Sequence, residues 1–186
     1  MRRLNINKLR HEKNFVTTSS DEALKDVTPI NWSKEVLNGE KRVLVKTDKS
    51  YVKIMCKLGD IIVIKKYKDR GNNLSRHSFV VIDDEPGAIR GLSYDLVCNV
   101  MSSFKSKEQK KRKLRFLGNF PIVNEDTVTD PNDGKDGYIK SEQFYYFNKE
   151  KIDYIVIGSM SIEAFNNLID YIENLKIDIE EITDNL

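Results

Sequence analysis

Cysteine is scarce in this chain of 186 residues, which contains two cysteines. Cys56 and Cys98 each lie in an apolar run, with no Cys-x-x-Cys pattern and no clustered histidines. A thiol in such surroundings usually packs as a small hydrophobic side chain. We therefore expect no structural zinc site, and the residues indicate no other metal and no cofactor.

Long apolar runs are missing as well. No segment approaches the roughly 20 apolar residues that cross a bilayer, and the first residues contain no apolar signal-peptide region. From these absences we expect a cytoplasmic protein that has no membrane partner. Internal repeats and low-complexity linkers are also absent. The length favours one domain with an appendage, and two small domains are the alternative.

Neither sign of charge dominates, since 31 basic residues face 29 acidic ones and the net charge is +2. The distribution is uneven, however. Residues 105–115 hold seven basic side chains and one acidic, whereas the chain from Glu163 onward holds seven acidic side chains and one lysine. This asymmetry indicates an anionic partner at one surface and a helix that faces solvent or a basic partner at another. The alternative for residues 105–115 is a solvated loop that aids solubility.

Three β-branched runs between residues 59 and 103 predict an antiparallel meander. We place its strands at residues 61–67, 77–83 and 94–101. The first connection, over residues 65–76, is interpreted as a long loop that carries five basic residues and one acidic. Long loops on a rigid sheet often hold binding residues.

The remaining segments predict a mainly β protein with helices, of the α+β class. Residues 1–58 are interpreted as a partly helical N-terminal extension, in which the runs 43–45 and 51–55 can be strand or helix and a helix is favoured. Further strands are expected at 114–122, 137–140, 142–147 and 153–157. A helix begins at Ser161, whose hydroxyl can cap it, and apolar residues then recur at three- and four-residue spacing. Residues 59–178 form the main domain, and residues 179–186 form an acidic tail that frays.

Several short motifs occur in an order that resembles the MazF/PemK family of toxin–antitoxin endoribonucleases. The matching pieces cover roughly residues 59–175. They are Gly59-Asp60-Ile61-Ile62-Val63, Arg76-His77-Ser78-Phe79-Val80-Val81-Ile82, Val100-Met101-Ser102-Ser103, Glu142-Gln143-Phe144 and Ile157-Gly158-Ser159-Met160-Ser161.

The resemblance implies a small SH3-like β-barrel with a C-terminal helix, assembled as a homodimer. It also implies cleavage of single-stranded RNA without metal, by attack of the 2′-hydroxyl, leaving a 2′,3′-cyclic phosphate. A cognate antitoxin would restrain the activity, and a protein antitoxin is favoured over an RNA one. By the same resemblance, Arg76 and either Ser102 or Ser103 carry the chemistry.

These residue types suit the reaction. A guanidinium offers planar donors that match phosphate oxygens, and a serine hydroxyl can donate to the same oxygens. His77 replaces the proline that the family typically has after the arginine, and an imidazole can serve as acid or base. The alternative is that His77 points to the face opposite Ser78 and acts only as a surface or interface residue.

Basic residues near this site are expected to follow the phosphate backbone of RNA. The polar connection before Arg76 is more basic than its counterpart in the family. Three aromatic residues, Tyr67, Phe104 and Tyr94, can stack on bases or pack in the core, and core packing is favoured for Tyr94. The expected RNA-binding residues are Lys65, Lys66, Lys68, Arg70, Lys105, Lys110, Arg112 and Gln143.

Two other functions remain open. One is a non-catalytic SH3-like barrel that binds nucleic acid or a protein target, as gyrase poisons with this barrel do. The other is a nuclease similar to the ToxN type, which an RNA restrains.

Overall fold

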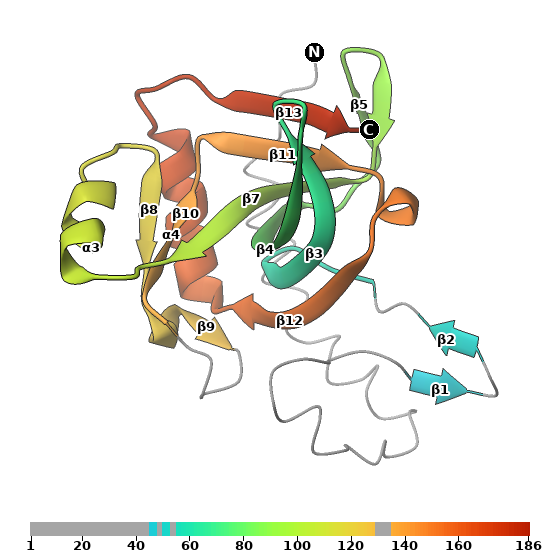
Figure 1. The fold of residues 1–186 in the computed structure, drawn as a ribbon, viewed down its shortest axis with the longest axis horizontal. Coiled ribbons are helices and arrows are strands. Elements are labelled where there is room, and N and C mark those ends of the chain that lie inside the picture. The colour runs from blue at the N-terminus through green and yellow to red at the C-terminus, as the bar shows by residue number, and fades with distance from the viewer. Residues whose placement is uncertain (1–44, 48–49, 53–54, 129–134) are drawn as a thin grey trace.

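The computed structural model describes residues 45–47, 50–52, 55–128 and 135–186, with side chains for residues 55–127 and 135–186. Within these ranges the chain is mainly β, as expected, and one mixed sheet organises it (Figure 1). The sheet runs in the order β13-β11-β7-β4-β3-β12-β9, and β10 joins it through β7 and carries β8 on its other edge. Every neighbouring pair is antiparallel except β11 and β13.

The strand bounds follow the expected order of elements, although several differ in length. The strands of this sheet are β3 (Asp60–Asp69), β4 (Asn72–Asp83), β7 (Leu96–Ser103), β8 (Asn119–Ile122), β9 (Thr127–Val128), β10 (Gly137–Lys140), β11 (Gln143–Phe147), β12 (Tyr154–Met160) and β13 (Glu180–Asn185). Short 3-10 turns at Asn124–Asp126 and Lys149–Lys151 connect some of them.

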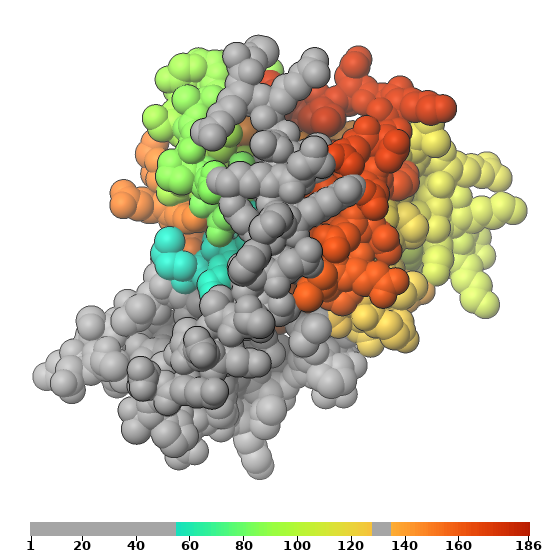
Figure 2. Space-filling view, turned by 180° about the vertical axis from the view of Figure 1, so that it is seen from behind, coloured from blue at the N-terminus to red at the C-terminus, as the bar shows by residue number. Residues whose placement is uncertain are grey.

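One helix covers a face of the sheet. Helix α4 (Ile162–Glu173) begins where the sequence predicts, and the Ser161 hydroxyl accepts a hydrogen bond from the Ala164 amide at 3.1 Å. Its apolar stripe, which includes Phe165 and Leu168, packs against one face of the sheet in a core that contains Val80 and Ile139. Seen from behind, α4 lies exposed on its outer side, and the basic helix α3 projects at the edge of the molecule (Figure 2).

A second core fills the opposite side of the sheet. Phe79, Tyr145 and Phe147 are almost fully buried there, and their rings meet edge to face at centroid distances of 5.3 and 5.7 Å about Phe79. Strand alternation sends Phe79 to this core and Val80 to the core under α4, because successive side chains point to opposite faces. The sheet is therefore buried on both sides through its centre, and polar side chains gather at its ends.

The prediction of a long loop over residues 65–76 is wrong. β3 and β4 form a hairpin that closes with Arg70 and Gly71, whose φ angles are +50° and +78°. Two consecutive positive φ angles match the tight turn that suits the twist of paired strands. The polar residues indicated a loop because the outer half of the hairpin is exposed to solvent. Lys65, Lys66 and most later side chains of the hairpin are exposed.

Three other expectations need correction. A second hairpin, β5 (Gly87–Ile89) and β6 (Leu92–Tyr94), stands where the sequence indicated only a turn. Strand β7 therefore starts at Leu96 instead of residue 94 and extends to Ser103. The basic segment is neither a loop nor the start of a strand, since it folds as α3 (Lys107–Lys113), capped by Ser106.

Both ends of the chain also differ from expectation. The expected helical runs near residues 43–55 are contradicted in part, because β1 (Val45–Thr47) and β2 (Ser50–Val52) pair as strands. Residues 1–44 of the proposed extension, with His11, lie outside the described residues. The acidic C-terminal residues do not fray, since β13 adds to the sheet beside β11. In the described part of the chain, no helix is long and apolar enough to cross a membrane.

The hairpin turn gives a first test of the fold. A Cβ at Gly71 would meet no atom within 4 Å, so only the positive φ of +78° opposes a side chain there. We expect Gly71→Ala to lower the free energy of unfolding by roughly 1–2 kcal/mol, because an L-residue is strained in this region. Gly71→Asn should cost less, since asparagine tolerates the left-handed conformation. Urea unfolding of the three proteins measures the difference, and an alanine variant as stable as the wild type would contradict the turn.

Candidate functional site

The candidate site lies where β4 enters the sheet and β7 leaves it. These strands pair antiparallel with Ser78 opposite Met101. Beyond this pair the side chains of His77 and Ser102 meet, with His77 Nε2 3.4 Å from Ser102 Oγ. That distance is at the long end of the hydrogen-bonding range. The structure thus joins two of the four residues that the sequence analysis proposed for catalysis.

The other two proposed residues, Arg76 and Ser103, do not join this pair. Each is the chain neighbour of a member of the pair, and neighbouring side chains of a strand point to opposite faces. Both are exposed. The four residues expected to act together are therefore divided between two faces of one sheet corner.

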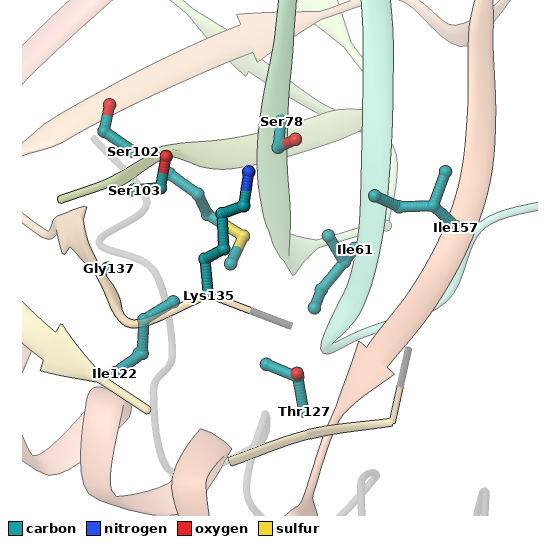
Figure 3. Close-up of a pocket in the computed structure, with 10 residues that line it drawn as sticks. Ile61, Ser78, Ser102, Ser103, Ile122, Thr127, Lys135, Gly137 and Ile157 are labelled. Atoms are coloured by element: carbon teal, nitrogen blue, oxygen red, sulfur yellow. The ribbon is translucent and has the colours of Figure 1, made fainter. Parts of the chain in front are cut away.

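A pocket of about 220 Å³ opens on the face that Ser103 shares with Ser78, and Ser102 also borders it. Ile61 and Ile157 form part of its apolar wall, and the Lys135 ammonium points toward its hydroxyl-lined side (Figure 3). Close to this pocket β10 approaches β7 so tightly that a Cβ at Gly137 would lie 2.6 Å from the Ser102 carbonyl oxygen. Among the residues that the structure describes, this face offers hydroxyls and an ammonium, and no imidazole or carboxylate lines the pocket.

His77 is half-buried on the opposite face, next to aromatic rings. Its ring centroid lies 6.2 Å from that of Tyr67 and 6.5 Å from that of Phe79. Burial lowers the pKa of His77, and the nearby positive charge of Lys140 lowers it further. Both effects disfavour the protonated ring. His77 is therefore held as a neutral imidazole at neutral pH, the form that can accept a proton.

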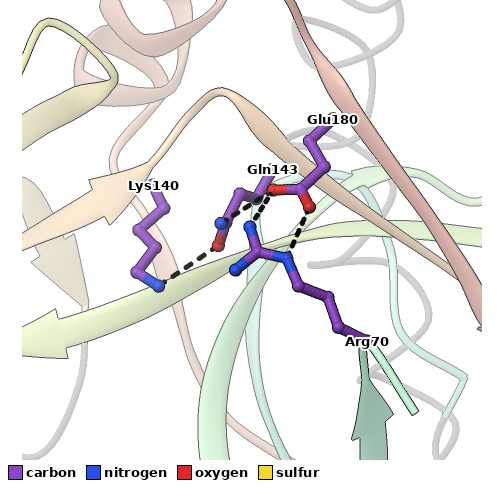
Figure 4. A network of polar contacts seen from close by, with 4 residues as sticks. All are labelled: Arg70, Lys140, Gln143 and Glu180. Carbon is purple, nitrogen blue, oxygen red and sulfur yellow. Dashed lines mark hydrogen bonds and ion pairs between the residues drawn. The ribbon is translucent and has the colours of Figure 1, made fainter.

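A chain of polar contacts continues from Lys140 across the end of the sheet (Figure 4). Lys140 Nζ donates to Gln143 Oε1 at 3.2 Å, and Gln143 Nε2 donates to Glu180 Oε2 at 3.0 Å. Glu180 also receives two hydrogen bonds from Arg70, at 2.7 and 2.6 Å. The Arg70 guanidinium lowers the pKa of Glu180. This arrangement orients Lys140 and Gln143 while it neutralises Arg70.

The basic helix α3 extends the same end of the molecule. Phe104 and Tyr138 stack at a centroid distance of 5.3 Å, and lysines of α3 lie over them. Lys110 Nζ is 5.5 Å from the centre of the Phe104 ring, and Lys113 Nζ is 5.7 Å from that of Tyr138. Because Tyr138 pairs with Ser102 across β10 and β7, this aromatic pair connects α3 to the candidate site.

The structure separates the expected RNA-binding residues into groups. Gln143 adjoins the His77–Ser102 pair through Lys140, and Lys110 and Arg112 are on α3. Lys65, Lys66 and Lys68 are exposed on the outer hairpin. Tyr67 is 6% exposed, and the Tyr94 ring lies 4.9 Å from the buried Tyr146 ring. Both rings pack against the cores, so neither is an open stacking surface. Of the remaining expected residues, Arg70 is paired with Glu180, and Lys105 is exposed with its amide bonded to Gln109.

Several residues of the site were missed. Lys140, Lys113 and Tyr138 were not singled out, although each lies near a residue that was. A basic residue three positions before Gln143 was a usable signal for Lys140. Nothing in the sequence indicated the role of Glu180, because β13 reaches the site through its parallel pairing with β11 and through hydrogen bonds to the β3–β4 hairpin, both distant in sequence.

Both cysteines are buried and free, and among the described residues no cluster of three histidine, cysteine or acidic side chains could hold a metal ion. Neither the protein-family models nor the curated proteins gave a match to this sequence. The residues of the site are therefore the basis for inferring its function.

The environment of His77 can be tested directly. We expect an NMR titration to give His77 a pKa below the usual value of 6.5, with burial as the main cause. Lys140→Ala should raise that pKa, because it removes a positive charge that opposes protonation. The chain has two histidines, so His11→Ala assigns the two signals. A His77 pKa at or above 6.5, or one unchanged by Lys140→Ala, would contradict this account.

Proposed function

We propose that this protein is a metal-independent endoribonuclease that cuts single-stranded RNA at the His77–Ser102 pair. The observation that carries the proposal is the contact between a neutral imidazole and a hydroxyl, with an ammonium nearby. Cleavage of RNA through its own 2′-hydroxyl needs a base, donors for the phosphate oxygens and a proton for the leaving oxygen. The side chains of His77, Ser102 and Lys140 supply these functions.

The reaction begins when His77 removes the proton of the ribose 2′-hydroxyl. The bond between O2′ and phosphorus forms as the bond between phosphorus and O5′ breaks, and Lys140 gives a proton to the leaving 5′-oxygen. Ser102 donates a hydrogen bond to a non-bridging oxygen, where negative charge develops. Donors positioned in this way are often a large catalytic term, about 2.7–4 kcal/mol each. The products are a 2′,3′-cyclic phosphate and a 5′-hydroxyl.

Helix α3 supports the choice of RNA as the substrate. Four consecutive basic residues, 110–113, end this helix, and the stacked pair of Phe104 and Tyr138 lies beside it. Cations attract the phosphate backbone without regard to sequence. This basic surface and the His77–Ser102 pair occupy adjoining parts of the same sheet end, so a bound strand passes over both.

The proposal includes the relationship that the motifs imply. In this view the sheet is the SH3-like barrel of the MazF/PemK family, the protein acts in the cytoplasm as a homodimer, and an antitoxin restrains it. The mainly β fold with its C-terminal helix supports this view. The site differs from the family expectation, because His77, and not Arg76, shares a face with Ser102.

RNA cleavage in excess EDTA tests the nuclease. We expect the wild type to produce discrete fragments of a long single-stranded RNA that end in 2′,3′-cyclic phosphate. His77→Ala should slow cleavage by roughly 10²–10⁴-fold, the usual contribution of a general base. Glu163→Gln, an exposed change on α4, serves as the control for folding. Arg76→Ala tests which face carries the reaction. If Arg76→Ala abolishes cleavage and His77→Ala remains fully active, the reaction takes place on the face of Ser103 and the present proposal is wrong.

The pH dependence provides a second test. A base must be unprotonated, so the rate should rise with pH through the His77 pKa and then level off. Because that pKa is lowered from 6.5, the half-maximal rate should fall below pH 6.5. Lys140→Ala should move this limb to higher pH as well as reduce the rate. An acidic limb above pH 6.5 would show that another group is the base.

A further inference from the structure

A pocket of about 410 Å³ lies between the end of α3 and the turn from β10 to β11. Arg112, Lys113 and Phe116 line it from the α3 side, and Lys140, Glu142 and Gln143 line it from the sheet. Lys140 also acts on His77. The pocket therefore adjoins the proposed cleavage site and shares Lys140 with it.

One wall of this pocket contains a buried carboxyl group. Glu142 is 8% exposed, and its Oε2 atom is buried without a hydrogen-bond partner among the described residues. Burial raises the pKa of Glu142. A Cβ at Gly118 would collide with this carboxyl, so the glycine leaves the space that the group occupies. Buried polar atoms without partners are uncommon in folded proteins, and this one lacks a donor.

The other walls supply a stacking surface and positive charge. Phe116 is 51% exposed, which is unusual for a phenylalanine and leaves its ring open to a ligand. Arg112, Lys113 and Lys140 place three cations around the same space. Single-stranded RNA is recognised by this combination, in which a splayed base stacks on an aromatic ring while cations hold its phosphates.

We propose that this pocket binds a guanine base of single-stranded RNA next to the cleaved phosphate, an inference that rests on the nuclease proposed above. The Watson–Crick edge of guanine carries two adjacent donors, N1–H and the N2 amino group. The two oxygens of the Glu142 carboxylate accept both, after rotation about the terminal bond of the side chain. Phe116 stacks on the base, and Arg112 holds a flanking phosphate.

The other three bases do not offer this edge. Adenine presents an acceptor at N1 beside its amino group, and cytosine presents two acceptors beside its own. Uracil has one donor between two acceptors. Each of them would set at least one acceptor against the carboxylate, a repulsion that guanine avoids. A bidentate contact of this kind usually discriminates between bases by about 1–3 kcal/mol, which corresponds to roughly 5- to 150-fold in affinity.

Binding can be measured apart from cleavage with 2′-O-methyl RNA hexamers, which lack the nucleophile. Four hexamers carry guanine, adenine, cytosine or uracil at one central position within a run of uracils. Fluorescence anisotropy should show that the guanine hexamer binds roughly 5- to 150-fold more tightly than the others. Glu142→Gln should abolish this preference, because the amide nitrogen opposes one of the guanine donors. Glu163→Gln, a matched change on the outer side of α4, should retain it.

A second variant covers the case in which Glu142→Gln does not fold. Phe116 is exposed, so Phe116→Ala leaves the fold intact and should weaken binding of the guanine hexamer more than that of the others. Equal affinity for the four hexamers, or an unchanged guanine preference in Glu142→Gln or Phe116→Ala, would overturn the pocket. If the hexamers bind as expected but natural RNA is not cut, the nuclease proposal fails alone. If RNA is cut without regard to guanine, the pocket fails alone.

Discussion

The pairing of Ser78 with Met101 determines which side chains meet at this end of the protein. A shift of one residue in a strand exchanges its two faces. In the observed register His77 reaches Ser102, and Phe79 enters the aromatic core on the same side. The register is secure because both faces of β4 are buried further along the strand. Packing of the core thus fixes the register of β4 against β7. The same register brings His77 and Ser102 together at the strand end, outside the core.

The C-terminal strand is a second determinant of the site. Its ion pairs with Arg70 and Arg90 are largely exposed, and such pairs contribute about 0.2–1 kcal/mol each. The buried Ile182 and the pairing with β11 hold the strand more firmly. The ion pair with Arg70 instead positions the Glu180 side chain. Glu180 then binds Gln143, and Gln143 binds Lys140. Glu180, an acidic residue that would repel RNA phosphates, therefore orients the Gln143 amide and, through it, the Lys140 ammonium.

The sequence predicted elements whose signals are local. The strand that became β10, the cap at Ser161 and the apolar stripe of α4 all depend on neighbouring residues, and they were correct. The Arg70-Gly71 turn was missed because arginine rarely adopts a positive φ, and β13 because its partner is distant in sequence. The four proposed catalytic residues lie on two faces of the sheet because neighbouring side chains of a strand point to opposite faces. The contact of His77 with Ser102 and the burial of Glu142 against Gly118 required the tertiary structure.

Lys140 connects the two parts of the site and explains why they belong together. Its charge adds to the effect of burial in lowering the pKa of His77, and its side chain also lines the pocket that contains Glu142. An ammonium placed between an imidazole and a carboxyl group opposes protonation of the first and favours ionisation of the second. Lys140 therefore favours the form of each group that the two proposals require, an imidazole that can accept a proton and a carboxylate that can accept hydrogen bonds from guanine.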